Sequence, residues 1–486
     1  MVKYDLLIHG ATVVTSTSTQ VADLAVTNGR IAAISPSLDV EAARVIEAHG
    51  DYLLPGFIDA HVHFNEPGRT EWEGVATGSQ ALAAGGGTLF IDMPLNSDPP
   101  VLDAATFSAK AAVIEEKSVL DAAIWGGLVP DNHAHLKELA DCGVIGFKAF
   151  MSASGIDEFP CTHGKPLLEG MKRVADLRLP VAVHAESDAL TSALSRRAAE
   201  EGRTGIADYL ATRPIEAELE AIGEAINYSR QTGCALHVVH VSSRAGLDLI
   251  AAAKTQGVDV TAETCPHYLL LTDLDMVKLG AVAKCAPPLR PLDEVVQLRS
   301  ALGEGLIDTI GSDHSPAPPE MKTDANFFKV WGGISGCQHA LPLLFELALE
   351  EKIDLSAVAR MTATNVARRF RLAGKGDLAV GADADMVLLS STVAVDLRAT
   401  GEPITATSSK MRESPSPAPG GRGLPQIIRA EDLLYRHRQS PYVGRTSRVS
   451  VRETWARGLS VSPQSVRPKN SPAPRHPAQI LRPSPL

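Results

Sequence analysis

Residues 56 to 64 read Gly-Phe-Ile-Asp-Ala-His-Val-His-Phe, an apolar run that ends with His61 and His63. Side chains alternate along a β-strand, so residues two apart face the same side. Neutral imidazole is a favoured ligand for zinc-type cations. The pair therefore indicates two metal ligands at the end of a strand. Two polar residues at an ordinary strand end are the simpler interpretation, because this short motif is common.

Four further polar residues each end a short apolar run in the same way. They are Lys148 in Gly-Phe-Lys-Ala-Phe, His184 in Val-Ala-Val-His, His240 in Val-Val-His-Val and Asp313 in Gly-Ser-Asp-His-Ser. This recurrence favours the metal-site interpretation of His61 and His63.

The pattern from Pro55 onward alternates between strand and helix, which indicates βα units around a parallel sheet. Eight strands are predicted, over Gly56 to His63, Thr88 to Pro94, Asp121 to Val129, Gly143 to Met151, Pro180 to Glu186, Ala235 to Ser242, Val258 to Tyr268 and Leu306 to Ser312. Eight such units predict an α/β fold, a TIM (β/α)8 barrel over residues 55–373. The candidate ligands fall at the C-terminal ends of strands, where barrel enzymes build their active sites.

The flanking segments differ in pattern from the barrel. Short strands and turn residues in 1–54 predict a small β unit. The turn-punctuated residues 374–389 predict a pair of strands that adds most simply to this unit. Residues 398–430 look like a disordered insertion. Residues 459–486 are rich in Pro and Ser and lack acidic residues, which predicts a disordered tail; a frameshifted or fused end is the alternative.

The composition is that of a globular enzyme, with 44% hydrophobic and 21% charged residues. A net charge of −11 argues against a nucleic-acid partner. No apolar run approaches the roughly 20 residues that span a bilayer, and the N-terminus enters a strand pattern without a targeting segment. The six scattered cysteines suit reduced thiols. We therefore expect no membrane partner and a cytoplasmic location.

The ordered set His-x-His, Lys, His, His, Asp resembles the amidohydrolase superfamily, specifically its cyclic amidase branch of allantoinases, dihydroorotases and hydantoinases. The likeness covers residues 1 to about 397 and about 431 to 458. It is closest to the allantoinases in residues 61–74, 312–316 and 435–444. The resemblance implies the same barrel with a composite β-sandwich formed by residues 1–54, 374–397 and 431–458. It also implies a homotetramer.

The resemblance also implies a centre of two divalent cations, zinc above all, with cobalt, manganese and iron as alternatives. His61 and His63 would hold one cation, and His184 and His240 the other. Lys148 would be carbamylated by carbon dioxide to N6-carboxylysine and would bridge them. Asp313 would ligate the first cation and act as general base.

The expected chemistry is hydrolysis of a cyclic amide. Two cations lower the pKa of a bridging water, and Asp313 would pass its proton to the leaving nitrogen. The reaction implied by the resemblance opens allantoin, a small ureide, to allantoate in purine degradation. Hydantoinase, dihydropyrimidinase or dihydroorotase activity is the alternative. A noncatalytic scaffold on the same barrel is the non-enzyme alternative.

Position 65 bears on the choice of substrate. Related dihydroorotases place an arginine there to bind a carboxylate, whereas Asn65 suits a neutral ureide. Weaker pocket candidates at strand ends are Asn96, Ser154, Cys285 and Ser315. Of the other histidines, His237 and His314 are expected to face away from the site, His133, His135 and His163 to be solvated, and His267 is a candidate for the pocket wall.

Overall fold

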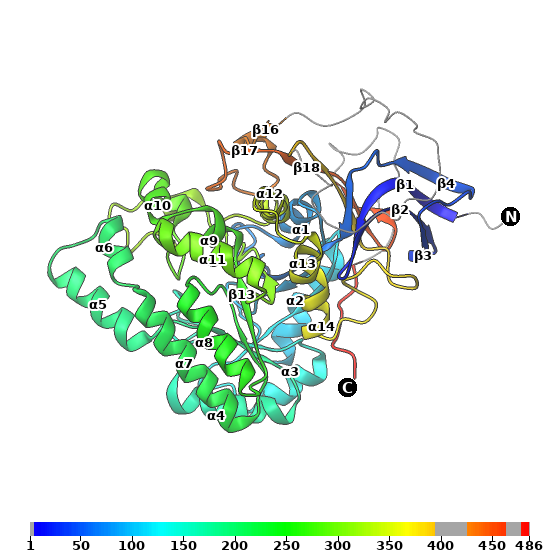
Figure 1. Cartoon of the computed structure of the whole chain (residues 1–486). Helices are drawn as coiled ribbons and strands as arrows, with labels where there is room; N and C mark the ends of the chain where they lie inside the picture. Colours follow the sequence, from blue (N-terminus) through cyan, green and yellow to red (C-terminus); the bar gives the residue numbers. More distant parts are fainter. Residues whose placement is uncertain (1–3, 394–424, 463–477, 486) are drawn as a thin grey trace.

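Parallel strands form a closed barrel in the computed structural model, which describes residues 4–393, 425–462 and 478–485 (Figure 1). One parallel sheet contains β6 (Phe57–Val62), β7 (Gly87–Asp92) and β8 (Asp121–Ile124). The other contains β9 (Gly126–Gly127), β10 (Phe147–Phe150), β11 (Val181–His184), β12 (Leu236–Val238), β13 (Val260–Thr264) and β14 (Thr309–Ile310). A parallel bridge from Val62 to His314 closes the ring. The predicted TIM barrel is therefore confirmed, with its third strand divided at Trp125.

Helices cover the outside of this barrel (Figure 1). They are α1 (Val75–Ala84), α2 (Ala104–Lys117), α3 (Leu136–Cys142), α4 (Gly164–Asp176), α5 (Asp188–Glu200), α6 (Ile206–Ala211), α7 (Ile215–Thr232), α8 (Arg244–Thr255), α9 (Pro266–Leu270), α10 (Asp273–Leu279), α11 (Leu292–Glu304), α12 (Ala340–Glu350), α13 (Leu355–Ala359) and α14 (Asn365–Arg369). Within the described ranges no helix is long and apolar enough to cross a membrane.

The sequence explains how individual helices begin, end and pack. Asp103 caps α2 by accepting a hydrogen bond from the Thr106 amide. Ile222 and Ile226 lie one helical turn apart on the buried face of α7. Gly233 ends α7 with a φ of 70°, a left-handed conformation that glycine adopts without steric cost.

A second, composite sheet joins the two ends of the chain (Figure 1). Its N-terminal strands are β1 (Tyr4–Val14), β2 (Thr19–Thr27), β3 (Arg30–Ser35), β4 (Ala42–Glu47) and β5 (Tyr52–Pro55), and its C-terminal strands are β15 (Met386–Ser391), β18 (Val449–Ala456) and β19 (Leu459–Ser460). The order is β19-β18-β15-β5-β1-β2-β3, with β4 beside β1. β15 pairs antiparallel with both β5 and β18, so the predicted union of N- and C-terminal segments is present.

Two expectations for the C-terminal segments are wrong in detail. Residues 374–389 hold only the start of β15 and no second strand, because Gly374, Gly376 and Gly381 have positive φ angles that turn the chain repeatedly. The first half of 431–458 does not join the sheet. Instead it lies beside the barrel, where Tyr435 packs its ring 4.9 Å from that of His314.

Parts of the expected insertion and tail are also ordered. Most of the expected insertion, 398–424, lies outside the described residues, but β16 (Gln426–Ile427) pairs with β17 (Thr446–Ser447). In the expected tail, β19 extends the composite sheet, and Ile480 bridges Ala122 of β8. The Ala122 amide donates to Gln479 and the Leu481 amide donates to Ala122. A segment too polar for its own core can still pair with an open strand edge.

Lys375 is expected to be a main contributor to the stability of the junction between barrel and sheet. Its ammonium is 3% exposed and lies within 3.1 Å of carboxylates of Asp121, Asp383 and Asp385. Lys375→Met would leave these carboxylates without their central cation. We expect the free energy of unfolding to fall by about 3–5 kcal/mol, measured by denaturant titration.

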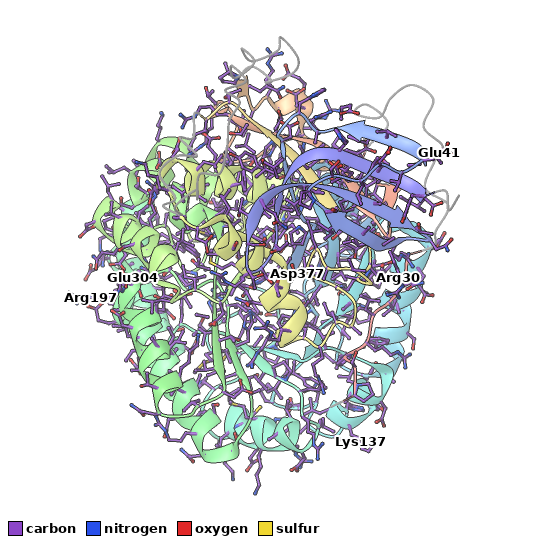
Figure 2. All side chains as sticks on the ribbon, turned by 45° about the vertical axis from the view of Figure 1, so that its right-hand side comes forward. Arg30, Glu41, Lys137, Arg197, Glu304 and Asp377 are labelled. Carbon is purple, nitrogen blue, oxygen red and sulfur yellow. The ribbon has the colours of Figure 1, made fainter. Side chains whose placement is uncertain are left out.

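The matched control is Lys137→Ala, which removes an exposed ion pair with Asp141 at the molecular surface (Figure 2). Exposed pairs contribute about 0–1 kcal/mol. Equal losses in the two variants would contradict a structural role for the buried cluster.

Candidate active site

His61 and His63 direct their Nε2 atoms toward Asp313. The distances to Asp313 Oδ1 are 3.2 Å and 3.6 Å. Each ring is held at its other nitrogen, since His61 Nδ1 lies 2.7 Å from Glu263 Oε1 and His63 Nδ1 lies 2.9 Å from the Leu95 carbonyl. Such partners fix the imidazole with Nε2 free to ligate. These two histidines and Asp313 can together hold one cation.

His184 and His240 form a second pair beside the first. His184 Nδ1 lies 2.9 Å from His240 Nε2, and the ring centroids of His61 and His240 are 5.5 Å apart. Glu186 Oε2 holds the other nitrogen of His184 at 2.8 Å. Burial lowers the pKa of both histidines, which keeps the rings neutral as metal ligation requires. This pair can contribute two ligands to a second cation.

Lys148 is fully buried on β10, and its Nζ has no hydrogen-bond partner among the described residues. Burial lowers its pKa to about 7. Its charge also lowers the pKa values of His61, His184 and His240. An unpaired buried ammonium is costly. The site is therefore suited to a modified or neutral lysine.

Asp313 follows β14 with a φ of 46°, a left-handed conformation. Burial would raise the pKa of its carboxyl, but His61 and His63 hold that pKa below its usual range. The carboxylate is therefore ionised, and its side chain is 13% exposed toward the cavity. It can accept a proton or ligate a cation.

A cavity of about 410 Å³ opens over these groups. The four histidines and Asp313 lie in its wall, and Lys148 is buried beneath it. Asn96, Ser154, Cys285 and Ser315, the weaker pocket candidates, all line it. The Ser154 hydroxyl is already engaged, because it donates to the Phe159 carbonyl at 2.6 Å.

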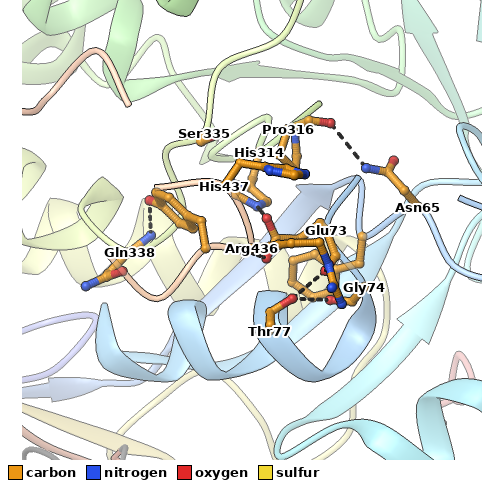
Figure 3. A network of polar contacts seen from close by, with 12 residues as sticks. Asn65, Glu73, Gly74, Thr77, His314, Pro316, Ser335, Gln338, Arg436 and His437 are labelled. Atoms are coloured by element: carbon orange, nitrogen blue, oxygen red, sulfur yellow. Dashed lines mark hydrogen bonds and ion pairs between the residues drawn. The ribbon is translucent and has the colours of Figure 1, made fainter. Parts of the chain in front are cut away.

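Asn65 does not line the cavity, so the expectation that it contacts substrate is wrong. Its side chain is fully buried, and Nδ2 donates to the Pro316 carbonyl at 3.3 Å (Figure 3). Its φ of 63° ends the strand-like alternation after His63 and turns the side chain away from the metal-ligand face. Asn65 instead holds the loop that follows Asp313.

The three segments with the closest allantoinase likeness, 61–74, 312–316 and 435–444, meet here (Figure 3). The Arg436 amide donates to Glu73 Oε1 at 3.1 Å, and Arg436 Nε donates to the Glu73 carbonyl at 2.6 Å. His437 Nε2 lies 2.7 Å from the Glu71 carbonyl. His314, which faces away from the cavity as expected, lies 3.6 Å from Glu73. These contacts support the site from outside.

Three other histidine expectations need correction. His237 faces the barrel interior, with Nε2 3.4 Å from Glu263 and its ring stacked on Trp125. Strand alternation predicts that His237 and His240 face opposite sides. The left-handed φ of 42° at His240 interrupts that alternation. His267 is buried but does not line the cavity. His133 is half-buried rather than solvated, whereas His135 and His163 are exposed.

The sequence interpretation missed the carboxylates that orient the histidines. Glu263 lies on β13, and Glu186 follows His184 by two residues. Glu186 is also paired with Arg213 of the cavity wall. Both glutamates stand at the end of an apolar run, and this position was a signal in the sequence that could have identified them. A carboxylate buried there requires a polar partner, and a neighbouring histidine can supply one.

Two pairs of histidines, a buried lysine and an ionised aspartate surround a cavity at the C-terminal ends of barrel strands. This combination defines the class of metal-dependent barrel hydrolases. Residues 52–458 match the family described as Amidohydrolase family, and the chain belongs to it.

Relatives and solved structures agree with this membership. The allantoinase of Rubrobacter xylanophilus is 48% identical over 95% of each chain. The allantoinase of Bacillus velezensis is 44% identical over 94% of each chain. Among solved structures, the L-hydantoinase (dihydropyrimidinase) from Arthrobacter aurescens has a TM-score of 0.85 and 29% identity, with 98% of this chain and 97% of that chain covered.

Asn65→Arg is expected to destabilise the protein rather than redirect its specificity. The larger cation would replace a fully buried amide at a left-handed position. We expect the free energy of unfolding to fall by about 2 kcal/mol or more, measured by denaturant titration.

Asn65→Gly is the matched control, because glycine tolerates the same φ and removes only the side-chain contact. Its loss should be about 1 kcal/mol. An arginine variant as stable as the parent, with gained turnover of dihydroorotate, would restore a substrate-contacting role.

Proposed function

We propose that this protein hydrolyses the cyclic amide of allantoin to allantoate, a ring opening in purine degradation. The observation that carries this proposal is the set of allantoinases that are 38–48% identical over about 95% of the chain. The two histidine pairs and the ionised Asp313 around one cavity supply the chemistry that such a reaction requires.

The donor set fits two divalent cations. His61, His63 and Asp313 would hold one, and His184 and His240 would hold the other. We propose that Lys148 is carbamylated by carbon dioxide and would bridge them, since its buried amine has no hydrogen-bond partner among the described residues and has a pKa lowered to about 7. Imidazole and carboxylate ligands suit zinc, and also cobalt, manganese or iron.

The cations, when bound, supply Lewis acidity to the substrate carbonyl and acidify water. Asp313 would act as general base, because its low pKa keeps it ionised and its carboxylate faces the cavity. It would take a proton from the attacking water and return it to the amide nitrogen that leaves. Glu263 and Glu186 would hold His61 and His184 in position throughout.

The cavity wall favours a neutral ureide over a carboxylate substrate. Two cations of the wall already have partners: half-buried Arg213 is paired with Glu186, and buried Lys284 donates to the carbonyls of Phe327 and Val330. The remaining cation, Lys329, is exposed. The Asn96 side chain, by contrast, lines the cavity, and an amide can both donate to and accept from a ureide. The preference for a neutral substrate therefore rests on the cavity wall and not on Asn65.

A simple hydantoin is the second candidate substrate. The L-hydantoinase (dihydropyrimidinase) structure and a D-hydantoinase from a Bacillus species, with a TM-score of 0.84 and 28% identity, support it. The homotetramer and the cytoplasmic location remain predictions from the sequence.

The deciding experiment compares ring opening of allantoin, dihydroorotate and a simple hydantoin. The purified protein is supplied with bicarbonate and with zinc, cobalt or manganese. We expect allantoin to have the highest kcat/KM. Preference for hydantoin would establish the second candidate, and turnover of none of the three with metal bound would reject both.

Two substitutions separate metal holding from proton transfer. Lys148→Ala should abolish turnover and empty the centre, whereas Asp313→Asn should abolish turnover with metal retained. Metal analysis beside the kinetic assay distinguishes the two. Full metal content and activity in the lysine variant would exclude the bridging role.

A further inference from the structure

A second group of metal-ligating side chains lies where the loop after β10 meets the start of α5. It consists of Cys161, His163 and Asp188, whose ligand atoms all lie within 4.8 Å of one another. Cys161 and Asp188 are half-buried, and His163 is exposed. None of the three lines the catalytic cavity. The fold therefore creates this cluster separately from the active site.

The spacing fits a tetrahedral ion after a small adjustment. Zinc binds sulfur at about 2.3 Å and nitrogen or oxygen at about 2.0–2.2 Å, which separates neighbouring ligand atoms by roughly 3.5 Å. The three ligand atoms lie within 4.8 Å of one another, so their separations exceed the value for a bound ion by at most a little more than 1 Å. His163 is exposed and Cys161 is half-buried, so an adjustment of this size at these two side chains requires no change in the core.

The surroundings orient the carboxylate for such a role. Ser192 Oγ donates to Asp188 Oδ1 at 3.2 Å, which leaves Oδ2 for a further contact. Partners of this kind position metal-ligating carboxylates. A mixed sulfur, nitrogen and oxygen set suits zinc or cobalt and does not suit magnesium or calcium, which prefer oxygen.

A nucleophilic cysteine is the competing interpretation of the same residues. Reactive cysteines have lowered pKa values. Here burial, followed by the charge of Asp188, raises the pKa of the Cys161 thiol. Such a thiol is a poor nucleophile, whereas the proximity of an imidazole nitrogen and a carboxylate oxygen to the sulfur is the geometry of a metal site.

We propose that Cys161, His163 and Asp188 bind a third divalent cation of the zinc type, which links two segments of the cavity wall. The loop after β10 carries Ser154, and α5 carries Ser195, and both residues line the cavity. An ion shared by the loop and the helix ties these walls together. This inference does not depend on which ring the enzyme opens.

Cobalt(II) titration of the full-length, reduced protein tests the site directly. The candidate ligands of the catalytic centre offer only nitrogen and oxygen, so thiolate-to-cobalt charge transfer in the near ultraviolet reports a cysteine ligand. We expect this band in the parent protein. The Cys161→Ser variant should lack the band and should bind one equivalent of cobalt fewer than the parent. Cys285→Ser is the matched control. Cys285 lies in the catalytic cavity and outside the group of Cys161, His163 and Asp188, so this variant should keep the band.

His163→Ala and Asp188→Asn should each weaken cobalt binding at this site by about tenfold or more. No band at saturating cobalt, or a band that persists in Cys161→Ser, would overturn the site. Unchanged affinity in both ligand variants would show a cysteine acting alone and would also overturn it.

Thermal unfolding tests the link between the walls. Zinc that binds only the folded state stabilises it. Zinc added beyond the catalytic equivalents should raise the Tm of the parent and leave that of Cys161→Ser unchanged. Equal shifts would overturn the proposed link.

Discussion

The closure of the barrel between β6 and β14 is the contact on which the active site depends. Val62 bridges His314, and the Ser312 amide donates to Asp59 Oδ1 at 3.0 Å. The same oxygen accepts from the His61 amide at 3.2 Å. Buried backbone donors require such partners. Since His61 lies at one of these strand ends and Asp313 at the other, closure sets their separation.

A layer of buried carboxylates around the histidines completes this arrangement. Glu263 holds His61 and reaches His237, and Glu186 holds His184 while paired with Arg213. In a low-dielectric interior, unpaired charges are costly, so each carboxylate needs its partners. The result is a set of imidazoles with defined orientation before any cation binds, which is the condition for precise ligation.

The strands could be predicted because apolar runs between turn residues are local signals. Side-chain direction could not always be predicted, because the alternation of a strand fails where the backbone turns left-handed. The expectation that His237 and His240 face opposite sides relied on alternation and failed, because His240 has a positive φ angle; Asn65, which also has a positive φ, contacts Pro316 instead of lining the cavity. The pairing of Ile480 with Ala122 was likewise hidden, since it depends on an open edge of β8 and not on the composition of the tail.

The sequence by itself determined the barrel, the order of the ligand-type residues and the strand ends that carry them, because those features follow from local periodicity. Only the tertiary structure decided which groups meet. It turned Asn65 toward Pro316, joined Glu73 to Arg436 and brought Cys161 near Asp188. Such contacts join segments far apart in the chain, and their geometry depends on how all the strands and helices pack together.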